Sequence, residues 1–431
     1  MTVKVVNIRI ALCAFIFFSG ITTISGQKLK TIIISNPASL ARPDELVILK
    51  REIIDKYFHP SPKFIAVSAK EKKLAVQHTD EDGDGKWDEV IFLYSFKANE
   101  KVSFTISSVK ENTEATAIQR AHVRMRKKNS DDSFGPNIIS ETMPPQNPAT
   151  DFSKHKLPMY LTEGPAWEND KVAFRLYFDV RNNKDIYAKT TAKMMMDTVG
   201  ANPKVSYHEL SGWGMDVLHV AKSLGAGALA ISVPQAGRED TLIRLGGQNI
   251  KKTVYRQIAD GPLLAKFSVM YDWEINDKPV QVKEEISIWG GQYFYESDVT
   301  VKGAPAGSKL VTGIANFYEN TFDTITFDKA AIGFTYGKQA ENKDNLGLGI
   351  LVNKQDFVKA DSINRSNTDV NETYIITQKI TENMPLHYRF YVGWERTDKR
   401  FITALGFKIF LKEEAVKYSQ VIKMKWQRKN E

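Results

Sequence analysis

The side chains best suited to chemistry lie on a stretch that alternates between two faces. In "VAFRLYFDV" (172–180), apolar residues share one face while Arg175 and Tyr177 share the other. Such a polar face is either a solvated outer surface or the lining of a cleft. The stretch "HYRFYVGW" (387–394) repeats the arrangement with His387 and Arg389. Because Arg binds carboxylate or sulfate through paired hydrogen bonds, two such strands would suit an anionic sugar.

Two loops add further candidates for acid–base chemistry and sugar binding. The loop before residue 172 holds Trp167, Glu168 and Asp170, and a second loop holds Tyr207, His208, Trp213 and Asp216. A Trp among carboxylates is typical of a sugar-stacking platform, although Asn-Asp before a strand is also ordinary turn chemistry. His208 is the first candidate for proton transfer, since His exchanges protons near neutral pH. The sequence contains no nucleophile elbow, dinucleotide fingerprint or His-Glu-x-x-His motif.

The stretch "DEDGDGKWDE" (80–89) resembles a cation-binding loop. An EF-hand would need Glu at its twelfth position, and counting from Asp80 that position is Ile91. The flanking residues predict strands, so we interpret the segment as a hairpin tip in which Gly83 and Gly85 adopt positive φ. A structural Ca²⁺ held by Asp80, Asp82 and Asp84 remains an alternative to a bare turn.

The elements that must position these residues are almost all strands. Short runs rich in β-branched and aromatic residues recur from residue 28 to 112 and from 159 onward, with helical turns expected only at 361–366 and 412–419. We therefore predict an all-β fold, with an N-terminal immunoglobulin-like sandwich and a C-terminal β-supersandwich of the galactose-mutarotase kind. The predicted boundaries are 1–26 for a signal peptide, 27–115 for the sandwich, 116–158 for a connecting segment and 159–431 for the catalytic domain.

Composition places the chain among exported globular proteins. Of 431 residues, 42% are hydrophobic and 26% charged, and Lys4 and Arg9 precede the apolar run 10–18. That run favours a cleaved signal peptide and a periplasmic location, with an N-terminal membrane anchor as the alternative. The only cysteine, Cys13, lies inside it, which excludes thiol chemistry and disulfides after cleavage. Basic residues are scattered despite a net charge of +8, so no nucleic-acid partner and no membrane partner after cleavage are expected.

The motifs together resemble one family of secreted bacterial proteins. "EGPAWENDKVAFRLYFDVRNNKDIYAK" (163–189), "YHELSGWGMDVLHVAKSLGAG" (207–227), the Asp-rich stretch and "HYRFYVGW" are similar to a former domain of unknown function from polysaccharide-utilisation systems. That family includes the ulvan oligosaccharide dehydratase. The resemblance implies removal of water from a terminal glucuronic or iduronic acid linked to sulfated rhamnose, giving a 4,5-unsaturated uronate. One departure is His219, where Lys or another residue is expected, and His219 is therefore left out of the candidates.

Elimination across C4 and C5 of a uronate needs a cation for the carboxylate, a base for the C5 proton and an acid for the departing hydroxyl. Arg175 is the first candidate for the carboxylate, with Lys189 or Arg389 in reserve, and Tyr177 or Tyr207 would partner His208. The remaining candidates would bind sugar, orient His208 or stack on the ring: Trp167, Glu168, Asp170, Trp213, Asp216 and His387. No redox cofactor is required. Two alternatives stay open, a β-elimination lyase and a non-catalytic glycan-binding protein.

Overall fold

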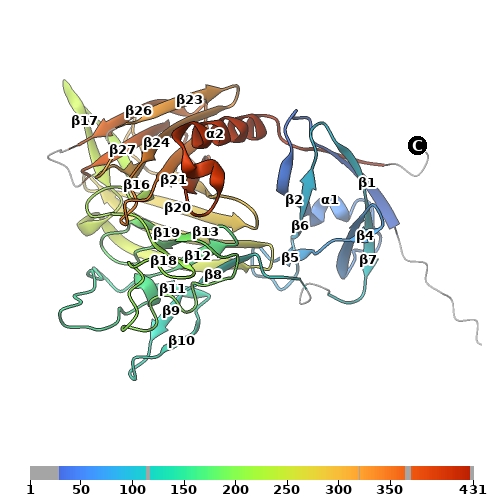
Figure 1. Ribbon diagram of the computed structural model, residues 1–431, viewed down its shortest axis with the longest axis horizontal. Coiled ribbons are helices and arrows are strands. Elements are labelled where there is room, and N and C mark those ends of the chain that lie inside the picture. The colour runs from blue at the N-terminus through green and yellow to red at the C-terminus, as the bar shows by residue number, and fades with distance from the viewer. Residues whose placement is uncertain (1–28, 113–116, 320, 365–369, 428–431) are drawn as a thin grey trace, which may run out of the picture.

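A computed structural model describes residues 29–112, 117–319, 321–364 and 370–427, and these residues confirm the predicted all-β fold. The predicted signal peptide lies outside the described residues. A smaller N-terminal domain lies beside a large domain of several sheets (Figure 1). None of the described helices is long and apolar enough to cross a lipid bilayer.

The N-terminal domain is a sandwich of two antiparallel sheets. One sheet has the order β29 (Lys423–Trp426), β1 (Leu29–Ser35), β7 (Lys101–Val109), β3 (Phe64–Ala69) and β4 (Lys72–Lys73). The other consists of β2 (Arg42–Lys50), β6 (Glu89–Phe96) and β5 (Gln77–Thr79), with the short helix α1 (Arg51–Ile54) after β2. Alternate residues such as Ile32, Val47, Phe92 and Phe104 fill the space between the sheets.

The large domain is built on one nine-stranded antiparallel sheet. Its strands, in spatial order, are β11 (Ser140–Thr142), β18 (Ile250–Asp260), β19 (Leu264–Ile275), β20 (Lys278–Trp289), β21 (Phe294–Lys302), β28 (Leu386–Trp394), β25 (Leu346–Asn353), β24 (Ala330–Gly337) and β23 (Asp323–Phe327). Long adjacent strands, paired over most of their length, explain why this sheet is the scaffold for the rest of the domain.

Two five-stranded sheets cover one face of that scaffold. The first has the order β15 (Gly214–Asp216), β14 (Lys184–Lys189), β13 (Val172–Leu176), β12 (Ala166–Asn169) and β8 (Ala121–Arg124). The second has the order β17 (Arg238–Arg244), β16 (Ala226–Gln235), β22 (Lys309–Ala315), β27 (Thr373–Lys379) and β26 (Phe357–Ile363). Phe174 and Ile231 from these sheets pack against Phe267, Tyr295 and Phe390 of the scaffold, which forms the main core.

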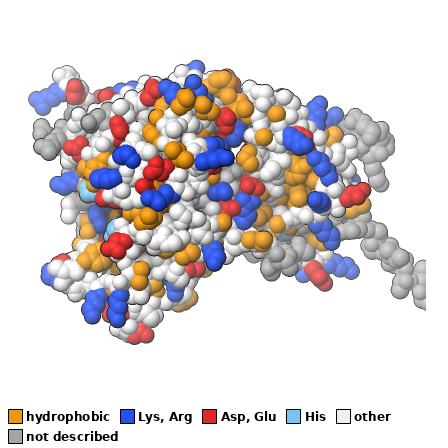
Figure 2. All heavy atoms as spheres, in the orientation of Figure 1, with side chains coloured by type: hydrophobic (Ala, Val, Ile, Leu, Met, Phe, Trp, Pro, Cys, Tyr) orange, Lys and Arg blue, Asp and Glu red, His pale blue; other side chains and the backbone are white. Residues whose placement is uncertain are grey.

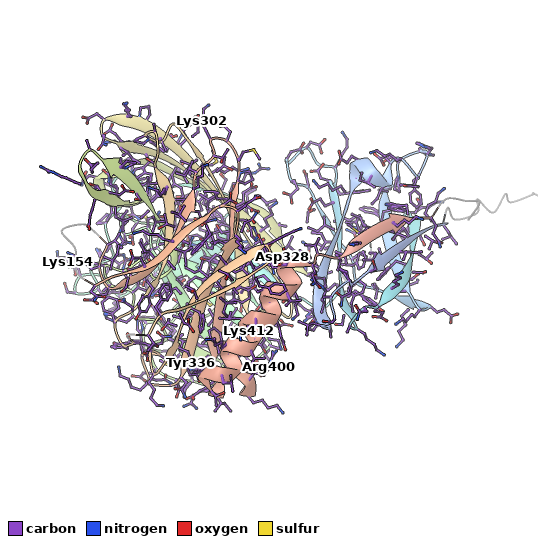
Figure 3. The ribbon with its side chains drawn as sticks, turned by 90° about the horizontal axis from the view of Figure 1, so that it is seen from above. Lys154, Lys302, Asp328, Tyr336, Arg400 and Lys412 are labelled. Carbon is purple, nitrogen blue, oxygen red and sulfur yellow. The ribbon has the colours of Figure 1, made fainter. Side chains whose placement is uncertain are left out.

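The remaining elements are short except for one helix, α2 (Ala404–Ser419). They are the pair β9 (Arg126–Lys128) and β10 (Phe134–Asn137) and the single turns η2 (Leu161–Glu163), η3 (Gly247–Asn249) and η4 (Lys399–Ile402). Phe407, Phe410 and Leu411 of α2 pack on the outer face of the nine-stranded sheet, in a cluster that also includes Ile91 of β6. Seen from above, the C-terminal end of α2 points toward the N-terminal domain (Figure 3).

The domain boundaries differ from the predicted ones at two places. The predicted connecting segment 116–158 supplies β8, β9, β10 and β11, and β8 and β11 belong to sheets of the large domain. The predicted catalytic domain runs to residue 431, whereas β29 pairs with β1 in the N-terminal sheet, with Ile33 opposite Lys425. Local patterns cannot reveal this pairing, because the two strands are separated by nearly the whole chain.

Candidate active site

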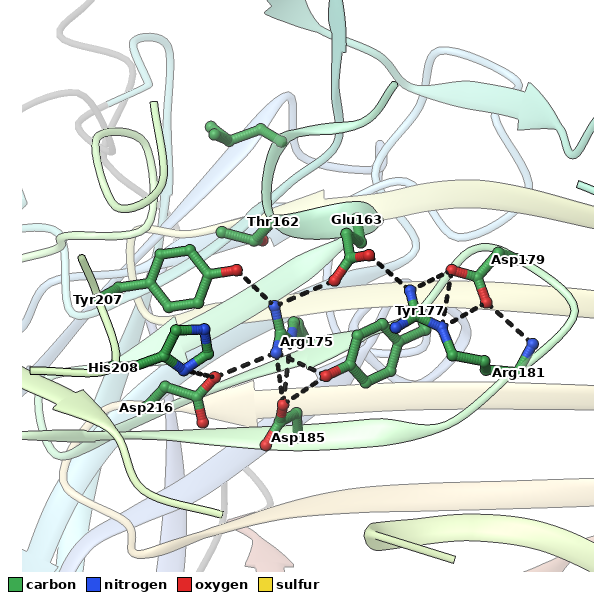
Figure 4. Close-up of polar contacts among 12 residues, drawn as sticks. Thr162, Glu163, Arg175, Tyr177, Asp179, Arg181, Asp185, Tyr207, His208 and Asp216 are labelled. Atoms are coloured by element: carbon green, nitrogen blue, oxygen red, sulfur yellow. Dashed lines mark hydrogen bonds and ion pairs between the residues drawn. The ribbon is translucent and has the colours of Figure 1, made fainter. Parts of the chain in front are cut away.

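Strand β13 turns one face into the main core and the other toward a polar cluster. Phe174 and Leu176 pack inward, while Arg175 lies on the opposite side, where the hydroxyl of Tyr177, one residue beyond the strand, reaches it. That side is not a solvated surface, because Arg175 is only 2% exposed and Tyr177 only 7%. The turn η2 and the long loop between β14 and β15 cover it, as Figure 4 shows.

The Arg175 guanidinium is the centre of this cluster (Figure 4). Its Nη2 donates to the Tyr177 hydroxyl at 2.6 Å, to Asp185 Oδ2 at 2.6 Å and to Asp216 Oδ2 at 3.0 Å. Its Nη1 donates to the Tyr207 hydroxyl at 3.2 Å. The Tyr177 hydroxyl also donates to Asp185 Oδ2, at 2.8 Å. Arg175 therefore fixes two tyrosine hydroxyls and two carboxyl groups relative to one another.

Sheet register explains how the two carboxyl groups reach Arg175. Asp185 of β14 lies directly opposite Arg175 of β13, and Asp216 of β15 lies opposite Tyr187 of β14. The close start of β15 requires Gly214, which has φ +133° and whose Cβ would come within 1.9 Å of the Ala188 carbonyl oxygen.

The loop between β14 and β15 carries Tyr207 and His208 over the cluster. Buried Glu168 anchors the first part of this loop, because its Oε1 accepts the backbone N–H groups of Met195 and Met196, both at 2.7 Å. Lys189 pairs with the other Glu168 oxygen and donates to the Asn169 carbonyl at 2.7 Å. Glu168 and Lys189 therefore position the loop from below, and neither side chain is exposed to a ligand.

Above the cluster is an open pocket of about 570 Å³. Arg175, Tyr177, Asp185, His208 and Asp216 contribute to its lining. The His208 side chain is 61% exposed, and its Nδ1 lies 3.5 Å from Asp216 Oδ2. A buried ionisable floor beneath an accessible imidazole is an arrangement suited to proton transfer.

The environment shifts the pKa values of this pocket in opposite directions. Burial, together with the charge of Asp185, raises the pKa of the Asp216 carboxyl well above its ordinary value, although Arg175 opposes the shift. Burial and the charge of Arg175 lower the pKa of His208. Burial also raises the pKa of the Tyr177 hydroxyl and that of Tyr207. At neutral pH the site thus combines an uncharged imidazole with hydroxyl groups that retain their protons.

A strained turn closes one side of the cluster. Thr162 and Glu163 have φ of 49° and 66°, a region unusual for residues other than glycine. Arg124, fully buried, holds this turn by donating to the Leu161 carbonyl at 2.7 Å and to the Thr162 hydroxyl at 2.8 Å. Glu163 in consequence lies 3.6 Å from Arg175 and 2.6 Å from Arg181.

Other residues that the sequence puts forward lie outside the pocket lining. Trp167 is 1% exposed and stacks on Phe174 in the main core, so its ring is not available to a sugar. Trp213 is half-buried against Tyr187. Asp170 accepts the Gly291 N–H at 2.6 Å and pairs with Arg120 at 2.7 Å, which ties the domains together because Arg120 also binds Asp44.

The second Arg-x-Tyr strand does not join the first. Arg389 of β28 pairs with Glu296 at 2.6 Å, and His387 pairs with Asp298 at 2.9 Å. Both side chains line a separate cavity between the nine-stranded sheet, α2 and the N-terminal domain. The prediction that both strands form one concave sugar-binding surface is therefore wrong, since the strands belong to different sheets.

The Asp-rich stretch forms a hairpin tip in the N-terminal domain. Asp80 accepts the backbone N–H groups of Gly83 at 2.7 Å and of Gly85 at 2.8 Å, and both glycines have positive φ. Among the described residues, Asp80, Asp82 and Asp88 bring carboxylate oxygens within 4.8 Å of one another. Asp84 instead pairs with Lys86 at 3.2 Å. A Ca²⁺ at this tip stays a prediction, with Asp88 in place of Asp84.

The acidic residues Asp185, Glu163 and Glu341 of the site were not among the sequence candidates. Asp185 could have been found by pairing the 172–176 strand with the next one, which places it opposite Arg175. Glu163 depends on a strained turn that carries no sequence signature. Glu341, which also lines the pocket, comes from the loop between β24 and β25 and is linked to the site only by tertiary packing.

The chain resembles two solved structures in fold but not in sequence. A protein in glycosyl hydrolase family 38 and an alpha-mannosidase, both from Enterococcus faecalis, align with TM-scores of 0.51 and 0.50 at 8% and 7% identity. Each alignment covers 94% of this chain but 48% and 46% of the other, so the chain spans about half the length of these enzymes. At such identity the likeness shows a shared all-β architecture.

Comparisons of sequence give a relative and a family. Uncharacterized protein P7 of Formosa agariphila is 23% identical over 406 residues, which are 89% of this chain and 90% of that protein. Residues 34–424 match the model of a family described as a domain of unknown function. That match extends from β1 to β29 and includes every residue of the pocket. The chain therefore belongs to the DUF4861 family.

Proposed function

We propose that this protein is a dehydratase that removes water from the non-reducing-end uronate of an anionic oligosaccharide of the ulvan type. The observation that carries the proposal is the convergence of Arg175, Tyr177 and His208 at one accessible pocket, with Tyr207 bonded to Arg175 beside it. These four residues come from two stretches of sequence, and they supply a fixed positive charge, protonated hydroxyl groups and an imidazole. The likeness in fold to carbohydrate-active enzymes supports a glycan substrate.

The reaction breaks the C5–H bond, and its electron pair forms the C4=C5 double bond. The bond between C4 and its hydroxyl oxygen breaks as the double bond forms, and the oxygen leaves as water after receiving a proton. The C5 proton is acidic only because the carboxylate is attached there, so negative charge grows on that carboxylate as the proton departs. Preorganised hydrogen-bond donors at the pocket stabilise this state.

Arg175 has a different role from direct carboxylate binding. Its guanidinium is 2% exposed and bonded to Asp185 and Asp216, so its charge is met by those carboxyl groups and it acts as a positioning residue. The hydroxyl groups of Tyr177 and Tyr207 accept hydrogen bonds from Arg175, and these held hydroxyl groups are assigned to the substrate carboxylate in its place. Because the Asp216 pKa is raised, a protonated Asp216 would not repel an anionic sugar.

The proposal includes export to the periplasm and a sulfated, uronate-containing oligosaccharide as the partner. Lys4, Arg9 and the apolar run 10–18 support export. Figure 2 shows basic and acidic side chains interspersed over the face drawn, so recognition of the anion is assigned to the pocket rather than to a broad basic surface.

Mass spectrometry of the products tests the proposal. The full chain is incubated with saturated ulvan di- and tetrasaccharides that carry a terminal uronate, and with matched oligosaccharides that end in rhamnose. The expected result is a product lighter by one water, with new ultraviolet absorbance, from the uronate-terminated set only. Cleavage into shorter chains would instead identify a β-elimination lyase, and binding without any change of mass would identify a glycan-binding protein; either result overturns the dehydratase.

A further inference from the structure

A second histidine faces the same pocket from another wall. His219 lies three residues beyond Asp216, on the segment that follows β15, and its side chain is 45% exposed. His219 and Glu341 line the cavity together with His208 and Asp216. The pocket therefore contains two imidazoles, each near a carboxyl group, and only His208 has a role so far.

The contacts of His219 are well defined. Its Nδ1 lies 2.9 Å from Glu341 Oε1, and the Glu341 backbone N–H donates to the Val217 carbonyl at 2.9 Å. The ring of Phe317 packs edge-on against the imidazole, with centroids 4.6 Å apart. The Tyr318 hydroxyl donates to the same Glu341 oxygen at 3.4 Å. Both the ring and its carboxylate partner are thus held in place by the segments that follow β15 and β22.

The two histidines differ in how they meet their carboxyl groups. His219 makes a hydrogen bond to Glu341, whereas His208 lies 3.5 Å from Asp216 without one. A carboxylate that accepts the Nδ1–H of an imidazole fixes its tautomer and leaves the Nε2 lone pair to accept a proton. His208, in contrast, lies beside the Tyr207 ring, whose hydroxyl is bonded to Arg175.

We propose that His219, oriented by Glu341, is the base that removes the C5 proton. Nε2 of His219 takes the proton while the C5–H electron pair forms the C4=C5 bond. On the opposite wall, beside His208, the hydroxyl group of Tyr177 or Tyr207 delivers a proton to the departing hydroxyl as the C4–O bond breaks. His219 then releases the C5 proton to solvent and the donor on the opposite wall regains a proton from solvent, so one water leaves, atoms and charge balance, and no cofactor is consumed. This inference rests on the proposed function and divides its proton transfers between two walls of the pocket.

Substitutions at both members of the pair test this assignment in the full chain. His219→Ala is expected to lower kcat for dehydration by about 10²–10⁴-fold with little change in KM. Glu341→Gln is expected to lower kcat by about tenfold or more, because an amide can hold the imidazole in the wrong tautomer. His387→Ala serves as the matched control, since His387 makes an equivalent 2.9 Å contact with Asp298 at a different cavity.

Chemical rescue separates a base from a residue that only supports the fold. Added imidazole should restore turnover to His219→Ala in proportion to its concentration, with more basic substituted imidazoles giving more, and should not affect His387→Ala. Overturning results are full turnover in His219→Ala, a rise in KM alone, or a loss that no imidazole restores in a variant with the wild-type melting curve. If the wild type itself yields no dehydrated product, the proposed function fails instead, and that result is visible before any variant is made.

Discussion

Strands β13 and β28 carry the same Arg-x-Tyr pattern and have different surroundings. Arg175 of β13 and Tyr177, one residue past the end of that strand, lie beneath a pocket, and the guanidinium binds the Tyr177 hydroxyl and two carboxyl groups. On β28, Arg389 pairs with Glu296, and the Tyr391 hydroxyl donates to Glu414 of α2 at 3.3 Å. Such a pattern therefore specifies only which face of the sheet a side chain occupies. Whether that side chain lines a pocket or packs against another element depends on what covers the face.

The largest expected effect separates the two arginines. Arg175→Lys keeps the charge but cannot reproduce bonds to Tyr177, Tyr207 and both carboxyl groups, so kcat/KM for dehydration should fall by about 10²–10³-fold. Arg389→Lys should leave kcat/KM unchanged and lower the melting temperature by about 2–4 °C. Steady-state kinetics and thermal melts check both; equal losses of activity in the two variants would contradict the comparison.

The two tyrosines provide a milder version of the same contrast. Tyr177→Phe removes the hydroxyl that Arg175 and Asp185 share, and we expect kcat to fall by about tenfold to 10²-fold. Tyr391→Phe removes only the bond to Glu414 and should cost about 1 kcal/mol of unfolding free energy with normal kcat. Urea denaturation alongside kinetics distinguishes them, and an active Tyr177→Phe would remove that hydroxyl from the proton-donating side.

Dependence of stability on pH is the third test, and it applies only to the β13 side. The Asp216 pKa is raised in the folded state, so the folded protein holds this proton more tightly than the unfolded chain does. The associated stability is complete below the ordinary Asp pKa and is lost as pH rises through the raised value. Asp216→Asn does not titrate, and its melting temperature should therefore gain on that of the wild type as pH increases. A constant difference between the two would show that Asp216 is ionised throughout.

The smallest expected effect concerns the Asp-rich hairpin tip. If Asp80, Asp82 and Asp88 hold Ca²⁺, adding the ion to chelator-treated protein should raise the melting temperature by a few degrees through mass action, roughly RT ln(1 + [L]/Kd). Turnover should stay the same, because the tip belongs to the N-terminal domain. Asp88→Asn should abolish the shift more completely than Asp84→Asn, and an unchanged melting curve in the wild type would favour a bare turn.

Much of the fold was predictable because alternation reveals strands directly. The stretch 387–394 lies within β28, whereas the stretch 172–180 forms a strand only over Val172–Leu176 and turns after that. Helix α2 (Ala404–Ser419) is far longer than the predicted turn at 412–419. The sequence hides its first half, because apolar Leu405 and Ile409 are exposed while apolar Phe407 and Phe410 are buried. Apolar residues on both faces conceal the helical period.

The candidate site was only partly predictable, for a different physical reason. Tyr207 and His208 could be selected by residue type, but their meeting with Arg175 depends on the anchoring of a long loop by Glu168. Trp167 is placed in the core because it lies on strand β12, where its side chain points inward. Glu341 approaches His219 from more than 120 residues away, a pairing that no local pattern records.

The pairing of β29 with β1 has a consequence for the order in which the protein folds. Residues 423–426 are synthesised after all the strands of the large domain, and β1 has an unpaired edge until they arrive. The large domain lies between these strands in the chain, so its sheets can assemble before the N-terminal sandwich is complete. Removing β29 should therefore leave the pocket residues in place while exposing β1 to aggregation and to proteases.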